Sequence, residues 1–313
     1  MGDTFKLFTR RGFISLGGGV LGAAVAACGR KPAAEMEKTE PAGSGAMPGG
    51  PAAAADKFPE DIPYAGFRMG VQSWCLREFK ALDQVIADVR ELGLAHVELA
   101  AVVHLPVDSP DEKIREAVAA FRQAGITIDA FGVERMPNEE ARCRRLFEYG
   151  EMLGALDLSA APDYDALPLV DRLSGEYGIP VGIHNHGPED KLYATPDMYR
   201  EHLAGISNRV GLLVDTGHYG RSGVDPLKVI DEFRERIHGV HLKDMVRGGP
   251  GEPEWVDRIV GQGVLDLPGL IRKLKEIDFK GPLSLEYESD PSNPMPQMKE
   301  CLAAVRKVCA ELG

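Results

Sequence analysis

Residues 181–186 read VGIHNH, and residues 210–218 read VGLLVDTGH. In each stretch an apolar run of strand length ends in side chains of the kinds that bind metal ions. The same pattern returns in residues 239–244, which read GVHLKD, and in residues 283–288, which read LSLEYE. Four such stretches, separated by segments of helix length, indicate parallel strands whose polar ends meet at one edge of a sheet.

The sequence after residue 60 alternates between two periods. Strand-length apolar runs occur at residues 67–74, 96–99, 126–132, 155–159, 180–186, 210–215, 237–242 and 282–287. Helical spacing predicts helices at residues 82–92, 111–124, 139–153 and 267–277. Eight strands alternating with helices predict an α/β fold with right-handed crossovers, a single (β/α)8 TIM barrel of about 250 residues. A doubly wound sheet is the alternative, but no glycine-rich dinucleotide fingerprint follows the first strand.

The first 27 residues predict export. Residues 9–13 (TRRGF) form a twin-arginine pattern, and the uncharged residues 13–27 are too short and too rich in Gly and Ala for a membrane span. Residues 25–28 (VAAC) resemble a bacterial lipobox, which makes Cys28 the expected site of lipidation. A conventional signal peptide cleaved nearby is the alternative. We therefore expect a protein exported by the twin-arginine route, either periplasmic or held at the membrane by its lipid alone.

Residues 28–60 separate this signal peptide from the barrel. They consist mainly of Ala, Gly, Pro, Glu and Lys, with few large apolar side chains. Such a segment buries too little surface to offset the entropy of ordering. We expect a flexible linker there, followed by the barrel in residues 61–313.

The composition limits the partners. A formal net charge of −12 argues against a nucleic-acid partner, because such a partner requires a basic surface. The cysteines after Cys28 lack the spacing of a metal site; they are Cys75, Cys143, Cys301 and Cys309. We expect buried thiols, with a disulfide as the alternative in an exported protein. The sequence leaves a homo-oligomer open.

Alternation along the strands selects the side chains that meet at the mouth of the barrel. Residues two apart share a face of a strand, so His184 shares a face with His186. Polar residues at the C-terminal ends of barrel strands face the mouth, where the fold carries its chemistry. Four of them form the predicted metal site, namely His184, Asp215, His241 and Glu286. Two imidazoles and two carboxylates suit one Mn²⁺, Zn²⁺ or Co²⁺ ion, with Mg²⁺ as a further candidate, better than Ca²⁺.

Six short motifs stand on the predicted strands and in the loops after them. They are residues 70–74 (GVQSW), 96–99 (HVEL), 215–218 (DTGH), 241–244 (HLKD), 260–266 (VGQGVLD) and 285–286 (LE). In combination they resemble the xylose-isomerase-like TIM-barrel superfamily, in its branch of sugar phosphate isomerases and epimerases. This resemblance implies a metal-dependent enzyme that acts on a small carbohydrate.

The resemblance also implies a set of metal ligands. Members of the superfamily hold one divalent ion with a Glu, an Asp, a His and a second Glu, and the last three match Asp215, His241 and Glu286. The position of the first Glu corresponds to His184. Epimerases of the superfamily exchange a substrate proton between two glutamates. We therefore expect the metal here, but not that two-carboxylate mechanism.

Metal-assisted removal of a proton next to a carbonyl group is the most economical mechanism for such a site. The candidates for proton transfer and charge stabilisation are Glu286, His186, Glu98 and Lys243. The candidates for substrate contacts are Gln72, Trp74, Glu134 and His218, of which Glu134 is also an alternative acid or base. Two of these residues have a structural alternative: Glu98 as a buried supporting carboxylate, and His218 as a residue that orients the metal ligands.

Two further features receive no catalytic role. His96 stands at the start of its strand, at the end of the barrel that serves stability, and is expected to be a structural histidine. Residues 245–258 form an insertion rich in Gly and Pro before the last strand. The sequence is compatible with part of a lid or with a solvated loop there.

Three functions remain open. The first is a metal-dependent isomerase or epimerase of a sugar or keto-sugar, without phosphate because no glycine-rich anion site is visible. The second is a lyase or dehydratase acting on a keto-sugar or an oxidised glycoside. The third is a non-catalytic sugar-binding lipoprotein. A DNA-cleaving member of the superfamily is disfavoured, because the acidic charge and the export signal oppose DNA binding.

Overall fold

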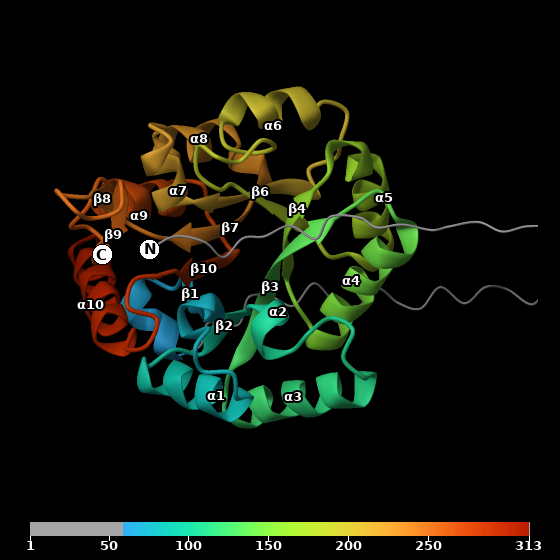
Figure 1. The fold of residues 1–313 in the computed structure, drawn as a ribbon, viewed down its shortest axis with the longest axis horizontal. Coiled ribbons are helices and arrows are strands. Elements are labelled where there is room, and N and C mark those ends of the chain that lie inside the picture. Colours follow the sequence, from blue (N-terminus) through green and yellow to red (C-terminus); the bar gives the residue numbers. More distant parts are fainter. Residues whose placement is uncertain (1–58, 313) are drawn as a thin grey trace, which may run out of the picture. The chain divides into compact units, whose positions relative to one another are not determined.

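The computed structural model describes residues 59–312, which form a closed barrel of eight strands (Figure 1). Neighbouring strands are parallel and follow the order β1-β10-β7-β6-β5-β4-β3-β2. This confirms the predicted TIM barrel. The predicted signal peptide, Cys28 and the linker up to residue 58 lie outside the described residues.

The elements of the barrel have the following bounds. The strands are β1 (Arg68–Gln72), β2 (His96–Leu99), β3 (Thr127–Met136), β4 (Asp157–Pro162), β5 (Val181–His184), β6 (Val210–Asp215), β7 (Ile237–Leu242) and β10 (Pro282–Leu285). The α-helices are α1 (Leu82–Glu91), α2 (Ala101–His104), α3 (Asp111–Gln123), α4 (Glu140–Leu153), α5 (Leu167–Tyr177), α6 (Pro196–His202), α7 (Thr216–Arg221), α8 (Pro226–Glu232), α9 (Leu267–Glu276) and α10 (Met295–Glu311). Short 3-10 helices are η1 (Pro59–Tyr64), η2 (Ser73–Leu76), η3 (Tyr164–Ala166) and η4 (Arg234–Arg236).

Several strands differ in length from the predictions. β1 ends at Gln72 rather than at residue 74, and β4 covers Asp157–Pro162 rather than residues 155–159. Three further differences affect the mouth of the barrel. β3 continues to Met136, past the predicted end at residue 132, because its last residues pair with β4 after a shift in register. β5 ends at His184 and β10 at Leu285, both earlier than predicted. His186 and Glu286 therefore stand in the loops that follow these strands, where alternation along a strand no longer sets the direction of a side chain.

The insertion before β10 forms a hairpin. Its antiparallel strands are β8 (Met245–Arg247) and β9 (Trp255–Asp257). At the end of β9, Asp257 Oδ2 accepts hydrogen bonds from the backbone N–H groups of Glu288 and Ser289, at 2.5 and 3.2 Å. The insertion is therefore fastened to the segment after β10 and is not a solvated loop.

Strand residues alternate between an apolar outer layer and a polar interior. Val71, Val97 and Leu242 are buried in the hydrophobic core. Glu98 directly follows Val97, and His241 directly precedes Leu242. The side chains of Glu98 and His241 therefore point into the barrel, where they contact each other. The interior near the mouth is therefore polar, while the apolar surface lies between the strands and the helices.

The helices cover the outside of the barrel (Figure 1). One of them, α3, buries Ile114, Ala117 and Phe121, which recur at a spacing of three to four residues. No helix within residues 59–312 has the length and apolar character needed to cross a membrane. The four cysteines of this part of the chain are buried free thiols, as expected.

Candidate functional site

Four side chains with metal-ligating atoms meet at the C-terminal ends of four neighbouring strands. His184 and Asp215 end β5 and β6, His241 lies on β7, and Glu286 directly follows β10. Each offers one ligand atom, and these atoms all lie within 4.8 Å of one another. All four side chains are buried. The structure thus brings together the four residues that the sequence singled out as metal ligands.

Buried atoms without partners mark this cluster as a site for a ligand. His184 makes no hydrogen bond through either ring nitrogen, and Asp215 makes none through Oδ2. His184 Nε2 and Asp215 Oδ2 lie 3.7 Å apart, which is too far for a hydrogen bond. Buried polar atoms normally have partners, and tetrahedral ligand atoms about 2.1 Å from a zinc ion stand roughly 3.4 Å apart. The residues therefore fit a divalent metal ion.

The protonation states suit metal binding at His184 and Glu286, whereas Asp215 and His241 must each lose a proton when a metal ion binds. Burial opposes protonation of His241, but the two carboxylates that contact it outweigh burial and raise its pKa well above its ordinary value. Burial lowers the pKa of His184 well below its ordinary value. Burial raises the pKa of Asp215 to about 8. Burial also opposes the ionisation of Glu286, but Lys243 and His241 outweigh it and lower the pKa of this carboxyl well below its ordinary value. A neutral imidazole and an ionised carboxylate are the forms in which these groups bind metal.

Glu98 holds His241 from inside the barrel. His241 Nε2 lies 2.9 Å from Glu98 Oε2, while His241 Nδ1 lies 2.8 Å from Glu286 Oε2. Glu98 accepts further hydrogen bonds from three side chains, those of Gln72, Ser159 and Ser284. The structure thus gives Glu98 the position of the supporting carboxylate rather than that of an acid or base in the open mouth. Gln72 is likewise engaged inside the barrel, since its Oε1 accepts a hydrogen bond from the Trp74 backbone.

A buried lysine adjoins the cluster. Lys243 Nζ lies 4.0 Å from Glu286 Oε1 and forms an ion pair with Glu288. Burial opposes its charge, but the carboxylates around it, Glu286 first among them, raise the pKa of Lys243, so the amine stays protonated. Glu288 is 33% exposed and accepts a hydrogen bond from Trp74 Nε1 at 3.1 Å. Sequence reasoning assigned Glu288 no role; the available signal was its position two residues after Glu286.

Two histidines line the β5–β6 side of the cluster. The His186 ring centroid lies 4.5 Å from that of His184 and 5.6 Å from that of His218. The side chain of His186 is 45% exposed. His218 is braced, because its Nδ1 accepts a hydrogen bond from Arg221 Nε and its backbone N–H donates to Asp215 Oδ1. Both predicted residues therefore stand beside the cluster, with His186 nearer to solvent.

Asn185 is a structural part of the site that sequence reasoning left without a function. Its side-chain amide donates to the backbone carbonyl of Asp215 at 3.0 Å and accepts from the backbone N–H of the same residue at 2.8 Å. These two hydrogen bonds join the ends of β5 and β6. They fix the backbone from which the Asp215 carboxylate projects.

Glu134 and Trp74 have partners of their own. Glu134, near the end of β3, forms an ion pair with Arg142 of α4 at 3.1 Å. Burial raises the pKa of Glu134. The guanidinium of Arg77 lies over the Trp74 ring, 5.3 Å from its centroid, so at most one face of the indole is available to a sugar.

A second polar cluster lies at the N-terminal end of the barrel. His96 Nδ1 lies 2.8 Å from Asp129 Oδ2, and His96 Nε2 lies 3.2 Å from Asp61. Arg68 Nη1 lies 3.6 Å from Asp129 Oδ1. His96 is buried among these groups, which agrees with the expected structural role.

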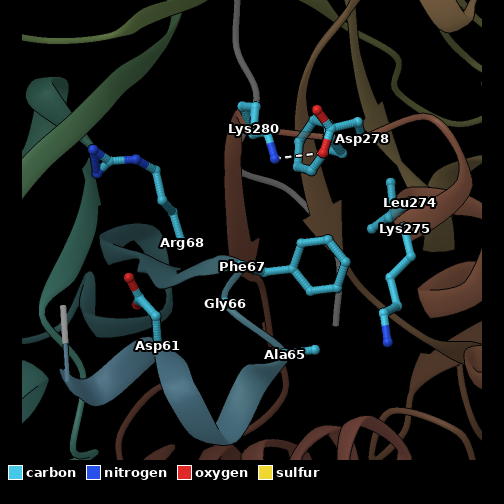
Figure 2. A pocket seen from close by; sticks show the side chains of 10 residues that line it. Asp61, Ala65, Gly66, Phe67, Arg68, Leu274, Lys275, Asp278 and Lys280 are labelled. Carbon is cyan, nitrogen blue, oxygen red and sulfur yellow. Dashed lines mark hydrogen bonds and ion pairs between the residues drawn. The ribbon is translucent and has the colours of Figure 1, made fainter. Parts of the chain in front are cut away.

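A cavity of about 350 Å³ opens beside this second cluster. Figure 2 shows Asp61 and Arg68 on one side of it and Lys275 on the other, with Phe67 between them. The cavity lies at the N-terminal ends of the strands, whereas β/α barrels carry their chemistry at the C-terminal ends. The mouth with its four converging ligand atoms is therefore the candidate site.

The fold and the cluster together define a β/α barrel with a candidate metal centre at its mouth. The chain belongs to the xylose isomerase-like TIM barrel family, which matches residues 82–308. An inosose dehydratase of Klebsiella pneumoniae is 31% identical over 137 residues, which cover 39% of this chain and 45% of that protein. The chain spans about half the length, or less, of the curated relatives it matches.

Solved structures show the same fold at low sequence identity. A zinc-bound IOLI protein aligns with a TM-score of 0.65 at 17% identity, covering 78% of this chain and 99% of that one. An L-ribulose 3-epimerase aligns with a TM-score of 0.60 at 17% identity, covering 79% of this chain and 97% of that one. At these identities the likeness shows the fold alone.

Proposed function

We propose that this protein is a metal-dependent isomerase or epimerase that removes a proton next to the carbonyl group of a sugar or keto-sugar. The observation that carries the proposal is the convergence of His184, Asp215, His241 and Glu286 beside the buried cation Lys243. Removal of such a proton leaves a negatively charged enediolate, which requires positive charge held in place before the reaction. Membership of the xylose isomerase-like TIM barrel family and the similarity to an inosose dehydratase support a carbohydrate substrate.

We propose one divalent ion at this cluster. Mn²⁺, Zn²⁺ or Co²⁺ is preferred over Mg²⁺ because two of the four ligands are imidazoles. When bound, such an ion polarises a carbonyl group and an adjacent hydroxyl of the substrate as a Lewis acid. The zinc in the IOLI structure of the same fold supports this choice.

The side chains around the cluster supply charge stabilisation, proton transfer and substrate contacts in the proposed reaction. Protonated Lys243 is placed to donate a hydrogen bond to the oxyanion, and Glu286 is the first choice for proton transfer. His186, which is partly exposed, is the second acid or base. Because Glu286 follows β10 and His186 follows β5, with β6 and β7 between them, a substrate can lose its proton to one and regain it from the other. Trp74 and His218 are the proposed substrate contacts.

A lyase or dehydratase is the second candidate. The inosose dehydratase relative supports it, as does the presence of His184 at the position of the superfamily's first glutamate. Elimination begins with the same proton removal. In the next step the C–O bond at the β-carbon breaks, its electron pair leaves with the oxygen, and a proton from His186 or His218 completes a molecule of water or an alcohol.

A panel experiment in D₂O tests the proposed function. Metal-loaded protein is incubated with ketohexoses, inososes and 3-keto-glucosides, and the products are followed by NMR and mass spectrometry. Deuterium next to the carbonyl of an isomer is expected, whereas loss of water or of an aglycone would identify a lyase. Replacing Glu286 by Gln is expected to slow the exchange by about 10²- to 10⁴-fold. Bound metal without exchange on any sugar would refute the enzyme and favour a sugar-binding protein.

We propose, on the sequence pattern alone, that the protein is exported and anchored through Cys28. A Cys28→Ser variant is expected to move from the membrane fraction to the soluble periplasmic fraction. A double variant, Arg10→Lys with Arg11→Lys, is expected to remain in the cytoplasm. Membrane retention of the Cys28→Ser protein would contradict the lipid anchor.

A further inference from the structure

We infer that Glu98 is a positioning residue that sets the ring tautomer of His241 and thereby the metal affinity of the mouth. The inference rests on the proposed metal site. Glu98 lies on β2 and His241 on β7, so their contact spans the interior of the barrel. The carboxylate is 1% exposed and lies on the side of His241 away from the other three ligands.

Four side chains direct hydrogen-bond donors at the two carboxylate oxygens of Glu98. Oε1 accepts from Gln72 Nε2 at 3.0 Å and from Ser159 Oγ at 2.6 Å. Oε2 accepts from Ser284 Oγ at 2.9 Å and from His241 Nε2 at 2.9 Å. An ionised carboxylate offers about four lone-pair sites, and four donors fill them. Glu98 is therefore an acceptor toward His241, and Nε2 carries the hydrogen.

This contact determines which nitrogen of His241 faces the cluster with a lone pair. With Nε2–H committed to Glu98, Nδ1 is the nitrogen whose lone pair is available to a metal ion once the ring is neutral. Nδ1 is the nitrogen that lies 2.8 Å from Glu286 Oε2 and 3.9 Å from Asp215 Oδ2. A carboxylate behind a ligating imidazole fixes the ring and makes it a stronger donor.

The arrangement is built from several strands rather than from one. The donors to Glu98 come from β1, β4, β7 and β10, through Gln72, Ser159, His241 and Ser284. Rotation of the Glu98 carboxylate would break hydrogen bonds on both sides of the barrel. The position of His241 is therefore set by the closed barrel and not by its own strand alone.

The test compares Glu98→Gln with Asp157→Asn. Both replace a buried carboxyl inside the barrel by an amide, but Asp157 makes no hydrogen bond with any of the four ligands. Zinc affinity is measured by competition with a chelating dye at pH 7. Glu98→Gln is expected to weaken Zn²⁺ binding by about 10- to 100-fold, and Asp157→Asn by less than about twofold. The glutamine keeps the shape of the side chain but presents an N–H group to Nε2.

A second readout needs neither substrate nor bound metal. Long-range ¹H–¹⁵N correlation spectra of the apo protein report which ring nitrogens of each histidine carry a hydrogen, and Nε2 of His241 is expected to carry one in the parent protein whether or not Nδ1 is also protonated. Ser284→Ala, which removes one donor to the same oxygen, is expected to weaken zinc binding in the same direction if Glu98→Gln fails to fold. Unchanged zinc affinity in these variants, or an Nε2 of His241 without a hydrogen in the parent, would overturn the inference. A parent protein that binds no zinc would refute the proposed metal site instead.

Discussion

At the N-terminal end of the barrel His96 and Arg68 lie against Asp61 and Asp129 at 2.8 to 3.6 Å, whereas at the mouth neither ring nitrogen of His184 makes a hydrogen bond. Both ends bury histidines and aspartates inside the same ring of strands. At the N-terminal end, two positive and two negative groups face one another, and we call these four residues the lower cluster. At the mouth, four candidate ligand atoms lie within 4.8 Å of one another. Among the described residues, no side chain forms a hydrogen bond with the ring nitrogens of His184 or with Oδ2 of Asp215.

His96 and His184 show that the neighbouring groups determine whether a buried histidine is protonated. Burial opposes protonation of His96, but Asp129 and Asp61 outweigh it and raise its pKa to about 9. Burial lowers the pKa of His184 well below its ordinary value. A protonated histidine between carboxylates is part of an ion-pair network, whereas a neutral histidine with free nitrogens is a ligand. Similar residues therefore serve stability at one end and binding at the other.

The largest effect is expected from removing one aspartate at each end. Asp215→Asn is expected to lose most of its bound metal while remaining folded. Asp129→Asn is expected to keep its metal but to lose about 3–5 kcal/mol of stability, because it removes the buried carboxylate that His96 and Arg68 share. Elemental analysis and urea unfolding measure the two outcomes. Full metal occupancy in Asp215→Asn, or metal loss in Asp129→Asn, would break the comparison.

The lower cluster also predicts a dependence of stability on pH. The folded pKa of His96, about 9, lies above its unfolded value of about 6.5, so its stabilisation is complete below about pH 6.5 and is lost as the pH rises through 9. The charged groups that face it are Asp61, Asp129 and, beyond it, Arg68. The shift corresponds to about 3 kcal/mol. The difference in unfolding free energy between the parent protein and His96→Gln is therefore expected to shrink by about that amount between pH 6 and pH 10; a constant difference would contradict the ion-pair assignment.

Removal of the metal probes the mouth alone. Free metal at 100-fold above its Kd stabilises a folded protein by about 2.7 kcal/mol, which corresponds to about 5–10 °C in Tm for a domain of this size. Adding a chelator is expected to lower the Tm of the metal-loaded parent by that amount. Asp215→Asn serves as the control and is expected to show almost no shift. An equal shift in the control would place the metal elsewhere.

The smallest effect is expected from an exposed ion pair near the lower cluster. Glu276 pairs with Arg234 and Lys273 on the surface, where water screens the charges. Replacing Glu276 by Gln is expected to leave the midpoint of urea unfolding unchanged within error. A loss of stability as large as that of Asp129→Asn would mean that burial does not explain how much the lower cluster stabilises the protein.

The convergence of the four candidate ligands was predictable because each of them directly follows an apolar run. His184, Asp215 and His241 stand at or near the ends of strands, and parallel strands of a barrel bring these ends together. The role of Glu288 was harder to predict from the sequence, because this residue lies in the loop after β10. Its contacts with Lys243 and Trp74 depend on the conformation of that loop. Its position relative to Glu286 was the one local signal.

The hairpin of β8 and β9 was not predicted for a similar reason. Each of its strands has three residues, and Gly and Pro dominate the turn between them. So short a pair carries little periodicity of its own. It is held partly by the hydrogen bonds from the backbone of Glu288 and Ser289 to Asp257, which join it to the far end of β10.

The sequence by itself determined the barrel and the four converging ligands, because apolar periodicity and the position of a residue at a strand end are local properties of the chain. Only the tertiary structure decided what each polar side chain faces. It placed Glu98 behind His241, and it surrounded His96 with opposite charge while leaving the ring nitrogens of His184 without a hydrogen bond. These contacts join strands that are far apart in the chain, and burial together with the neighbouring charges sets their protonation.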